Sequence, residues 1–487
     1  MRTTNEAPQP DNPGPDSPEA TAEGTVQARP APAGKPAIAA LGMLALSLGA
    51  LESAVTPTLP LLQRELSLTP AQGALLSIAM LITGGFLLPI TGNLGDRFGG
   101  KRVLIRLMAV VVLGGLVSSV APNLPVLLLG QVLQGALVGA LPLAFILVRK
   151  FLPEHQASVA LGTVSGALLA GGMLGTLISG PIAENLSRHW MFAVPTIGIA
   201  VSTLLVHWLL PNDPPGRAES RIDWPGLLLM SGIMLTIMLG LAVVPDAGGQ
   251  PIVLGALVVL LAVLIAGWVA VERRSRAPMV DLRMLTQPAV WSSYVITGAV
   301  CLGTQMSMYL VPQLLAVSGD GYGFGASATD IGFYLLPGAV ASAIAGPVAG
   351  FAVRHFGSRA AVTFAGVCMM AALLGVVFLH SAIWHLVTAK VLVALASGVC
   401  VTGVLVKTAT TVGEGDTGTA TSLLLMVRLI TFAAGAQLGG ALLTAGIPEG
   451  SNVPSESAFV TGFVVGGVIA ALSLLAVGKL NKGGQSQ

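Results

Sequence analysis

Glu52 is the residue of this chain whose position best suits proton chemistry. Of the 22 acidic residues, it alone lies well inside a long apolar run. An ionisable side chain deep in a bilayer costs at least ~2.5–3.5 kcal/mol, so it is expected to have a function there. A carboxyl group in such surroundings can take up and release a proton near neutral pH. We expect Glu52 to carry an exchangeable proton; the alternative is that it lies near the outer mouth of the run and reaches the interface.

Arg428 is the corresponding basic residue, well inside another apolar run. It could pair with Glu52 across a cavity, bind an anionic ligand or donate to helix carbonyls, and the sequence leaves these roles open. Lys390 lies near the outer end of its run and is expected to extend its ammonium group to the interface.

Five polar residues are candidates for the lining of a ligand cavity: Thr56, Gln134, Gln305, Tyr309 and Gln313. The last three follow one another at intervals of four residues, which places them on one face of a helix. This face favours a polar cavity wall, with Met306 and Met308 as adaptable apolar contacts. A hydrogen-bonded seam between two helices would give the same pattern.

Membrane-spanning helices must position these residues. With 54% hydrophobic and 9% charged residues and a mean hydropathy of +0.83, the chain is not a soluble protein. Spanning a bilayer takes ~20 residues. Fourteen apolar runs are long enough: 37–60, 72–95, 102–121, 125–148, 158–182, 191–210, 225–245, 251–271, 289–312, 328–352, 359–380, 384–407, 419–444 and 459–478. The sequence therefore predicts an all-α integral membrane protein with fourteen transmembrane helices.

The basic residues indicate how these helices are oriented. If the N-terminus is cytoplasmic, 20 of the 24 Lys and Arg residues fall on the cytoplasmic side, and only Arg64 and Arg188 fall outside. Such a bias favours both termini in the cytoplasm. The basic residues are dispersed in short loops, so we expect no nucleic-acid partner. Three cysteines, Cys301, Cys368 and Cys400, lie in apolar runs and are expected to be core thiols, not metal ligands.

An internal repeat divides the chain. The pattern Pro89-x-x-Gly92-x-x-x-Asp96-x-Phe98-Gly99-x-Lys101 is echoed 258 residues later by Pro347-x-x-Gly350-x-x-x-Arg354-x-Phe356-Gly357-x-Arg359. We therefore expect two matching six-helix bundles with two extra helices between them. The predicted parts are a disordered cytoplasmic tail (1–35), a first bundle (36–210), a linker with the two extra helices (211–288), a second bundle (289–480) and a cytoplasmic tail (481–487).

The stretch from Gly92 to Leu104 resembles the signature of the major facilitator superfamily, Gly-x-Leu-x-Asp-Arg-x-Gly-x-Lys-x-x-Leu. The matching residues are Gly92, Leu94, Asp96, Arg97, Gly99, Lys101 and Leu104. In this family the stretch joins the second and third helices. The resemblance implies that Gly92, Asp96, Arg97, Gly99 and Lys101 form a cytoplasmic conformational gate, with Asp96 and Arg97 pairing with neighbouring helix ends.

Two further motifs are similar to those of the fourteen-span drug:proton antiporters, often called DHA2. The antiporter pattern in the fifth helix appears as Gly162-x(8)-Gly171-x(3)-Gly175-Thr176-x(2)-Ser179-Gly180, with Thr176 where the family has proline. Small residues at this spacing also allow close helix packing without any antiport. In run four, Gln131 replaces an arginine that the family links to proton transfer, which leaves coupling to Glu52 and Arg428.

The resemblance covers roughly residues 37–480 and implies a secondary transporter of the cell membrane, not an enzyme. We expect proton-coupled efflux of small amphipathic drugs or antibiotics by alternating access, by a monomer that uses the proton gradient and no cofactor. Uniport or proton symport of a metabolite is the alternative, favoured by Gln131 and Thr176. The six histidines show no metal-ligand spacing, and no nucleotide-binding loop is present.

Overall fold

Backbone groups inside a bilayer must bond within their own segment, so apolar runs of this length are expected to be helices. The computed structural model describes residues 35–151, 154–211, 224–243, 251–274, 288–318, 322–411, 417–449, 451 and 453–477. The two predicted tails (apart from Lys35) and most of the predicted linkers lie outside these residues.

All the long elements of the described chain are helices. They are α1 (Lys35–Glu65), α2 (Pro70–Phe98), α3 (Gly100–Ser119), α4 (Leu124–Gln134), η1 (Gly135–Gly139), α5 (Ala140–Phe151), α6 (Glu154–Asn185), α7 (Arg188–Leu209), α8 (Trp224–Val243), α9 (Pro251–Arg274), α11 (Pro288–Ala316), α12 (Ala328–Phe378), α13 (Ile383–Thr411), α14 (Thr417–Ala445) and α15 (Glu456–Val477). Two spans lie in α12, and one span is shared by α4, η1 and α5. The predicted fold class and its fourteen transmembrane helices are confirmed.

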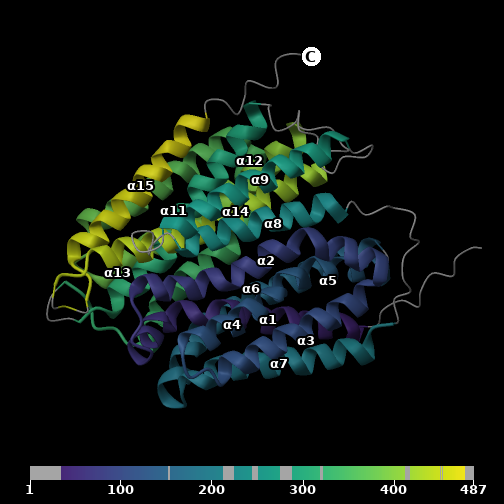
Figure 1. Ribbon diagram of the computed structural model, residues 1–487, viewed down its shortest axis with the longest axis horizontal. Helices are drawn as coiled ribbons and strands as arrows, with labels where there is room; N and C mark the ends of the chain where they lie inside the picture. Colours follow the sequence, from purple (N-terminus) through teal and green to yellow (C-terminus); the bar gives the residue numbers. More distant parts are fainter. Residues whose placement is uncertain are drawn as a thin grey trace, which may run out of the picture.

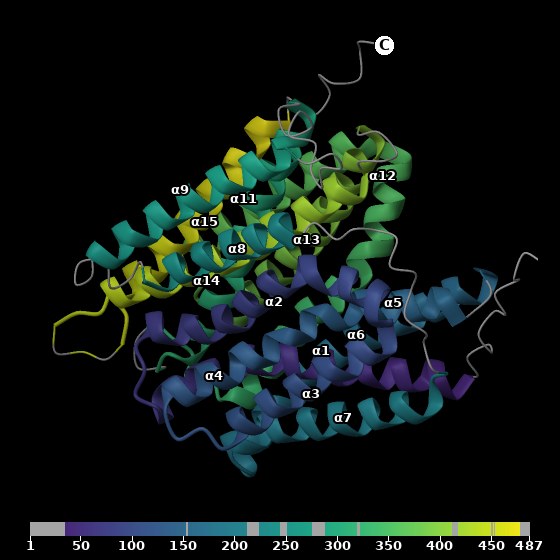
Figure 2. The ribbon, with the colours of Figure 1, turned by 45° about the vertical axis from the view of Figure 1, so that its right-hand side comes forward.

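The helices form two bundles that lie one above the other in Figures 1 and 2. Helices α1 to α7 pack with one another in the lower bundle, and α11 to α15 do so in the upper bundle. The bundles meet where α2 packs on α14, where α6 packs on α12, and where α1 contacts α11 and α12.

The internal repeat has a backbone counterpart. Gly99 ends α2 with φ 90°, and Gly357 bends α12 with φ 81° at the matching position of the second bundle. A positive φ is available to glycine at little cost, because glycine has no Cβ. Both repeats therefore use a glycine to turn the chain between two successive spans.

Close helix packing holds α6 on α1. A Cβ on Gly171 would lie 1.9 Å from the backbone oxygen of Leu46, and one on Gly175 would lie 2.3 Å from that of Ala50. On α1, a Cβ on Gly49 would lie 2.0 Å from the oxygen of Leu168. These glycines let the two backbones touch, as small residues do between membrane helices.

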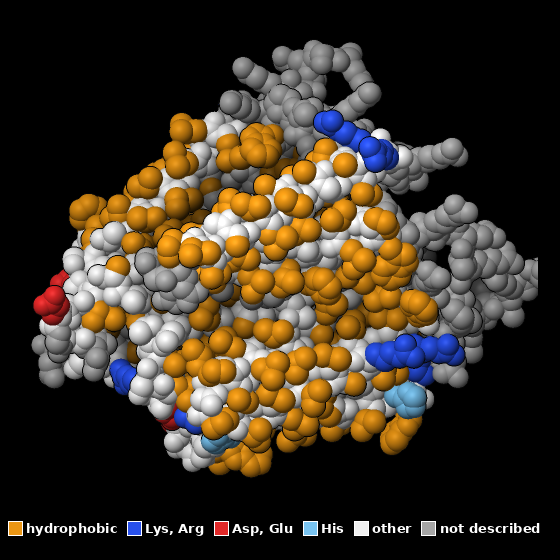
Figure 3. All heavy atoms as spheres, viewed as in Figure 1, with side chains coloured by type: hydrophobic (Ala, Val, Ile, Leu, Met, Phe, Trp, Pro, Cys, Tyr) orange, Lys and Arg blue, Asp and Glu red, His pale blue; other side chains and the backbone are white. Residues whose placement is uncertain are grey.

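The inserted helix α8 lies beside both bundles, between α2 and α14 (Figure 1). The Ser231 hydroxyl donates to the Phe86 carbonyl of α2 over 2.9 Å. Toward α14, Met230 and Met234 pack on Met426 in an apolar cluster. Its neighbour α9 contributes to the broad apolar face in Figure 3, which has basic side chains gathered at its right-hand end. Such a face suits contact with lipid tails.

Candidate functional site

The two bundles are joined at one end of the molecule, which we call the outer end because the charge pattern predicts that it faces out. Of the described residues, it carries 66–69, 186–187, 317–318 with 322–327, 379–382, and 446–449 with 451 and 453–455. The opposite, inner end carries Gly99 and Gly357.

A chain of buried side chains closes the outer end. The Gln63 amide of α1 donates to the Tyr309 hydroxyl of α11 over 3.2 Å, and the Gln313 amide donates to the Gln63 carbonyl over 2.6 Å. The Tyr309 hydroxyl donates in turn to the backbone oxygen of Pro70, the first residue of α2. We call this the Gln63–Tyr309–Gln313 network. Tyr309 and Gln313 thus take part in a hydrogen-bonded seam, and Gln313 also lines a cavity of about 560 Å³ between the bundles, so their roles toward a ligand stay predictions.

Further bonds between the bundles surround this network. Glu184 of α6 accepts from the backbone N–H of Thr329, over 3.2 Å, and from its hydroxyl, at the start of α12. The Ala71 N–H donates to Thr444 over 2.9 Å, and Arg64 donates to the Ala316 carbonyl. A carboxylate at a helix N-terminus also benefits from the helix dipole. Residue spacing does not reveal these bonds, because their partners are far apart in the chain.

The same helices separate toward the inner end. On α6, Gly180 packs against the Ala328 backbone, but a Cβ added to Gly162 or Gly166 would meet no atom of another element within 4 Å. On α12, Gly332 contacts the Thr176 oxygen, whereas Gly346 and Gly350 border open space. The structure is therefore closed at the outer end and open at the inner end along this seam.

Glu52 faces the space between the bundles. Its neighbours Leu51 and Ala54 are each 1% exposed, whereas Glu52 itself is exposed. Because α1 packs against α2, α6, α7, α11 and α12, we infer that this exposed side chain midway along α1 faces the gap between the helices. Its role as a proton carrier stays a prediction.

Arg428 of α14 lies across that space. Its guanidinium attracts the Glu52 carboxylate electrostatically, and it also acts on Cys301 of α11. No direct ion pair joins Glu52 and Arg428 among the described side chains. The guanidinium lies 5.1 Å from the centre of the Phe432 ring, a cation–π contact that holds it on its own helix. The opposite charges of Glu52 on α1 and Arg428 on α14, in different bundles, thus lie within range of electrostatic attraction.

Two of the predicted cavity residues lie near these helices. Gln305 is half-buried, and its Cβ would lie 3.0 Å from a Cβ on Gly435, where α11 meets α14. Thr56 is half-buried one turn from Glu52 on α1. Their roles toward a ligand stay predictions.

Gln134 and Gln131 lie inside the first bundle. The Gln134 amide is 1% exposed and donates to the Ser118 hydroxyl of α3 over 2.8 Å. The Gln131 amide donates to the Gln134 carbonyl over 3.5 Å, at the limit of hydrogen bonding. These contacts tie α4 to α3 within the first bundle, and a role of Gln134 toward a ligand stays a prediction.

The predicted gate residues are described only in part. Gly92, Asp96 and Arg97 belong to the helical backbone of α2, and the side chains of Asp96 and Arg97 lie outside the described part of the structure. Lys101 is 5% exposed, and its ammonium group donates to the Leu210 carbonyl over 2.7 Å. This carbonyl ends α7, where a cation satisfies an unpaired helix acceptor. Lys101 therefore fixes the inner ends of α3 and α7 together.

The residues of the antiporter-like motif differ in their surroundings. Gly171, Gly175 and Gly180 make close backbone contacts, while Gly162 borders open space. Thr176 donates to the Gly172 carbonyl over 2.9 Å, within α6, where the family has a proline without a donor. Ser179 is 2% exposed, and its hydroxyl has no hydrogen-bond partner in the described part of the chain.

Lys390 departs from its prediction. It does not reach an interface: it is 7% exposed, its ammonium nitrogen has no partner among the described residues, and its side chain packs on Gly338 of α12. The lack of a side chain at Gly338 makes room for the lysine stem, which sequence spacing alone did not reveal.

Comparison with known proteins agrees with this architecture. Residues 41–436 match the Major Facilitator Superfamily. The uridine/deoxyuridine transporter of Lactococcus lactis subsp. cremoris (strain MG1363) is 26% identical over 313 residues, which cover 63% of this chain and 65% of that protein.

The multidrug resistance protein B homolog of Mycobacterium tuberculosis (strain H37Rv) is 28% identical over 310 residues, covering 62% of this chain and 54% of that protein. The chain thus spans less than two thirds of the length of either relative. The crystal structure of the nucleoside transporter NupG has a TM-score of 0.67 at 11% identity, covering 92% of this chain and 99% of that one.

The family match covers most of the chain, and the structure has two facing bundles with an internal space between them. This arrangement and these relatives point to a transporter, not an enzyme. The protein belongs to the Major Facilitator Superfamily, as a fourteen-helix membrane transporter.

Proposed function

We propose that this transporter exports small amphipathic molecules, such as drugs or antibiotics, in exchange for protons. The observation that carries the proposal is the placement of Glu52 and Arg428 midway along helices of opposite bundles, within range of electrostatic attraction. The resemblance to the drug:proton antiporters and the relative named for multidrug resistance also support it.

The proton on Glu52 changes the charge of the cavity by one unit. When Glu52 is ionised, it balances Arg428; when it is protonated, Arg428 is left uncompensated. A cationic or polar substrate and a proton therefore compete for the same carboxylate. Exchange follows if the inner-open state binds substrate as Glu52 releases its proton to the inner side. In the outer-open state, Glu52 then takes up a proton from the outer side as the substrate leaves.

Alternating access is the motion that this mechanism needs. The Gln63–Tyr309–Gln313 network and the Glu184–Thr329 contact would break as the outer end opens, and the inner ends of α6 and α12 would approach each other. In this proposal the protein is a monomer in the cell membrane, its inner end and both termini face the cytoplasm, and the proton gradient replaces any cofactor.

A second candidate is uniport or proton symport of a metabolite. Gln131 favours it, because an amide cannot supply the positive charge that the antiporters have at this position. A relative named as a uridine/deoxyuridine transporter makes nucleosides a reasonable class to test.

Proton flux in proteoliposomes distinguishes these functions. Purified protein is reconstituted with a pH-sensitive dye, and cationic drugs, neutral drugs and uridine are added across a preset proton gradient. We expect drugs to dissipate the gradient and Glu52→Gln to abolish this response. Glu65→Gln is the matched control, because Glu65 lies on the same helix but pairs with Arg188 at the outer surface over 3.1 Å.

Other outcomes would change the assignment. Drug movement without any response of the gradient would make the protein a facilitator. Movement of uridine with the gradient, and of no drug, would favour symport. An equal loss in Glu52→Gln and Glu65→Gln would remove Glu52 from the coupling step.

A further inference from the structure

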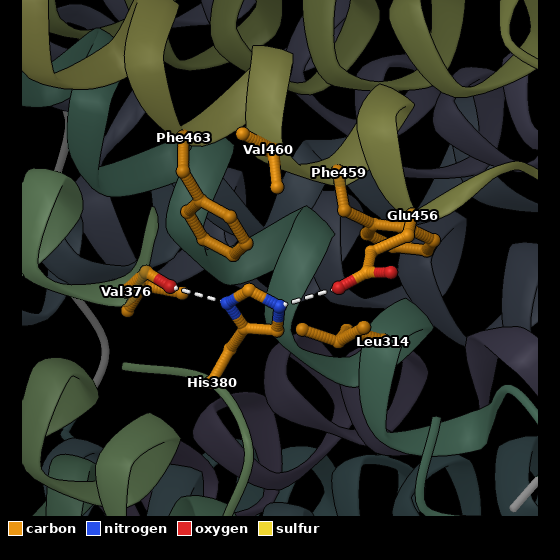
Figure 4. A pocket seen from close by; sticks show the side chains of 7 residues that line it. All are labelled: Leu314, Val376, His380, Glu456, Phe459, Val460 and Phe463. Atoms are coloured by element: carbon orange, nitrogen blue, oxygen red, sulfur yellow. Dashed lines mark hydrogen bonds and ion pairs between the residues drawn. The ribbon is translucent and has the colours of Figure 1, made fainter. Parts of the chain in front are cut away.

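His380 and Glu456 form an ion pair at the outer end of the second bundle. His380 lies in the turn between α12 and α13, and Glu456 is the first residue of α15. The imidazole Nε2 lies 2.8 Å from a Glu456 carboxylate oxygen, and Nδ1 lies 2.9 Å from the Val376 carbonyl oxygen (Figure 4). One ring thus connects the end of α12 to the start of α15.

Both partners of this imidazole are acceptors. A backbone carbonyl and an ionised carboxylate can only accept, and a neutral imidazole has only one N–H to donate. The imidazolium ion has two, so it alone satisfies both contacts. The His380 side chain is 20% exposed and that of Glu456 is 52% exposed, so protons from the outer solution can reach the pair.

The surroundings contain few other titratable groups among the described residues. From α11 and α15, Leu314, Phe459 and Phe463 pack around the ring (Figure 4). On the side of the α11–α12 turn, Tyr322 lies near Phe459, and burial together with Glu456 raises its pKa. On the side of α13, His385 accepts from the Ala382 N–H and lies against Trp384.

Glu456 also ends the turn that borders an outer vestibule. The vestibule, of about 560 Å³, lies between Gln63, Arg64 and Thr69 of the first bundle and Ser451, Val453 and Pro454 of this turn. The turn is anchored where the Ser455 N–H donates to the Gly446 carbonyl over 2.9 Å and where the Tyr322 hydroxyl donates to the Pro454 carbonyl. Movement of Glu456 would therefore move a wall of the vestibule.

We propose that His380 and Glu456 are a pH-sensitive latch that holds Val453 and Pro454, just before α15, against the outer vestibule while the imidazole is doubly protonated. Loss of one proton removes the positive charge that attracts the Glu456 carboxylate and leaves a single N–H for two acceptors. The hold on Val453 and Pro454 weakens, so the outer end opens more readily in alkaline surroundings. This regulation is separate from the proposed proton exchange at Glu52.

The direction of the pH dependence follows from linkage. The hydrogen bond to Glu456, as the largest cause, raises the pKa of His380 above its ordinary value of 6.5. A group with a raised pKa in the folded state contributes stability below its ordinary pKa, and this contribution is lost as pH rises through the raised value. The latch is thus closed in acid and is released as the pH rises through the raised pKa of His380.

Distances across the vestibule test the latch. Spin labels are attached to Ser67→Cys and Val453→Cys, which line opposite walls, in a Glu52→Gln background that removes the other proton site. The cysteine variants also carry Cys301→Ser, Cys368→Ser and Cys400→Ser. In nanodiscs, we expect the long-distance population to rise about fivefold between acid and alkaline pH, as expected for one lost hydrogen bond.

His380→Gln and Glu456→Gln should each make the distances independent of pH. His189→Gln is the matched control, because among the described residues the only hydrogen bond of His189 is to a backbone carbonyl, that of Ser119, over 2.6 Å, at the outer end of the first bundle. An unchanged pH response in both His380→Gln and Glu456→Gln would overturn the latch, as would an equal loss in His189→Gln. Since Glu52 is absent throughout, failure of the latch is distinguishable from failure of proton-coupled transport.

Discussion

Tyr309 joins three helices through one hydroxyl group. Tyr309 lies on α11. Its hydroxyl accepts a hydrogen bond from the Gln63 amide of α1 and donates one to the backbone oxygen of Pro70 at the start of α2. With 2% of its surface exposed, its hydroxyl has no water to replace these partners. The outer end of the transporter thus depends on a polar group that is satisfied only while the bundles are closed.

Removing this hydroxyl should loosen the outer end. Tyr309→Phe leaves the Gln63 amide without this partner and removes the added bond to the Pro70 carbonyl, at a cost of about 1–3 kcal/mol to the closed state. We expect faster labelling of Thr56→Cys by a membrane-impermeant maleimide added outside, in a cysteine-free background. Tyr334→Phe is the control, since Tyr334 of α12 has no hydrogen bond among the described residues. Equal labelling rates in the two variants would argue against the network as a closure.

The sequence could place Tyr309 and Gln313 on one helix face but could not say what they bond. Their partner Gln63 lies 246 residues from Tyr309, and nothing in local spacing reports on such a distance. Glu52 was easier to identify, because a carboxyl group in an apolar run is rare and expensive. The burial of Lys390 does not follow from the sequence for a related reason: the space that accommodates it is made by a glycine on another helix.

At the level of elements, α6 has two different halves. Its outer half packs on α1 and α12 through backbone contacts at glycines, and its inner half borders open space. The motif in the sequence predicted close packing along the whole stretch. The difference arises because the two bundles diverge toward the inner end, and this relative placement is not encoded in the spacing within one helix.

Alanine substitutions at the two ends of this motif should therefore differ. Gly175→Ala places a Cβ 2.3 Å from the Ala50 carbonyl oxygen, whereas Gly162→Ala meets nothing within 4 Å. Overpacking of this kind costs typically ~1–3 kcal/mol. We expect a lower midpoint of thermal unfolding in detergent for Gly175→Ala and an unchanged or higher one for Gly162→Ala. Indistinguishable midpoints would mean that α1 and α6 can separate without cost.

Over the whole molecule, the two bundles are expected to move as units while α8 stays with the first. The helix donates a hydrogen bond to α2 but meets α14 through methionine side chains, which adapt to changing contacts. A Cβ on Gly85 would lie 3.8 Å from that of Met234, the usual separation in a disulfide. Across the bundles, a Cβ on Gly440 would lie 2.7 Å from that of Ala74.

These two pairs should respond differently to cross-linking. A disulfide between Ala74→Cys and Gly440→Cys requires their Cβ atoms to move about 1 Å apart. Once formed by oxidation, it should lock the outer end and stop transport until a reductant is added. Oxidation of Gly85→Cys with Met234→Cys should leave most transport intact. Arrest by the second pair would show that α8 must move relative to α2.

The number of spans and the repeat were accessible from sequence, because hydropathy and glycine spacing are local properties. The placement of the inserted helices was not, since α8 and α9 have apolar residues on all sides and no face that marks a partner. In the structure, α8 packs against α2 and α14, and α9 packs against α8.

The position of α8 also has a consequence for how the protein is made. Its partner α2 is synthesised before it, and its partner α14 begins at Thr417, long after α8 ends at Val243. At ~5–20 residues per second, roughly ten seconds or more of translation separate the two. During that interval α8 can dock on a finished neighbour while Met230 and Met234 still face lipid. The second bundle is therefore assembled against a surface that the nascent first bundle already presents.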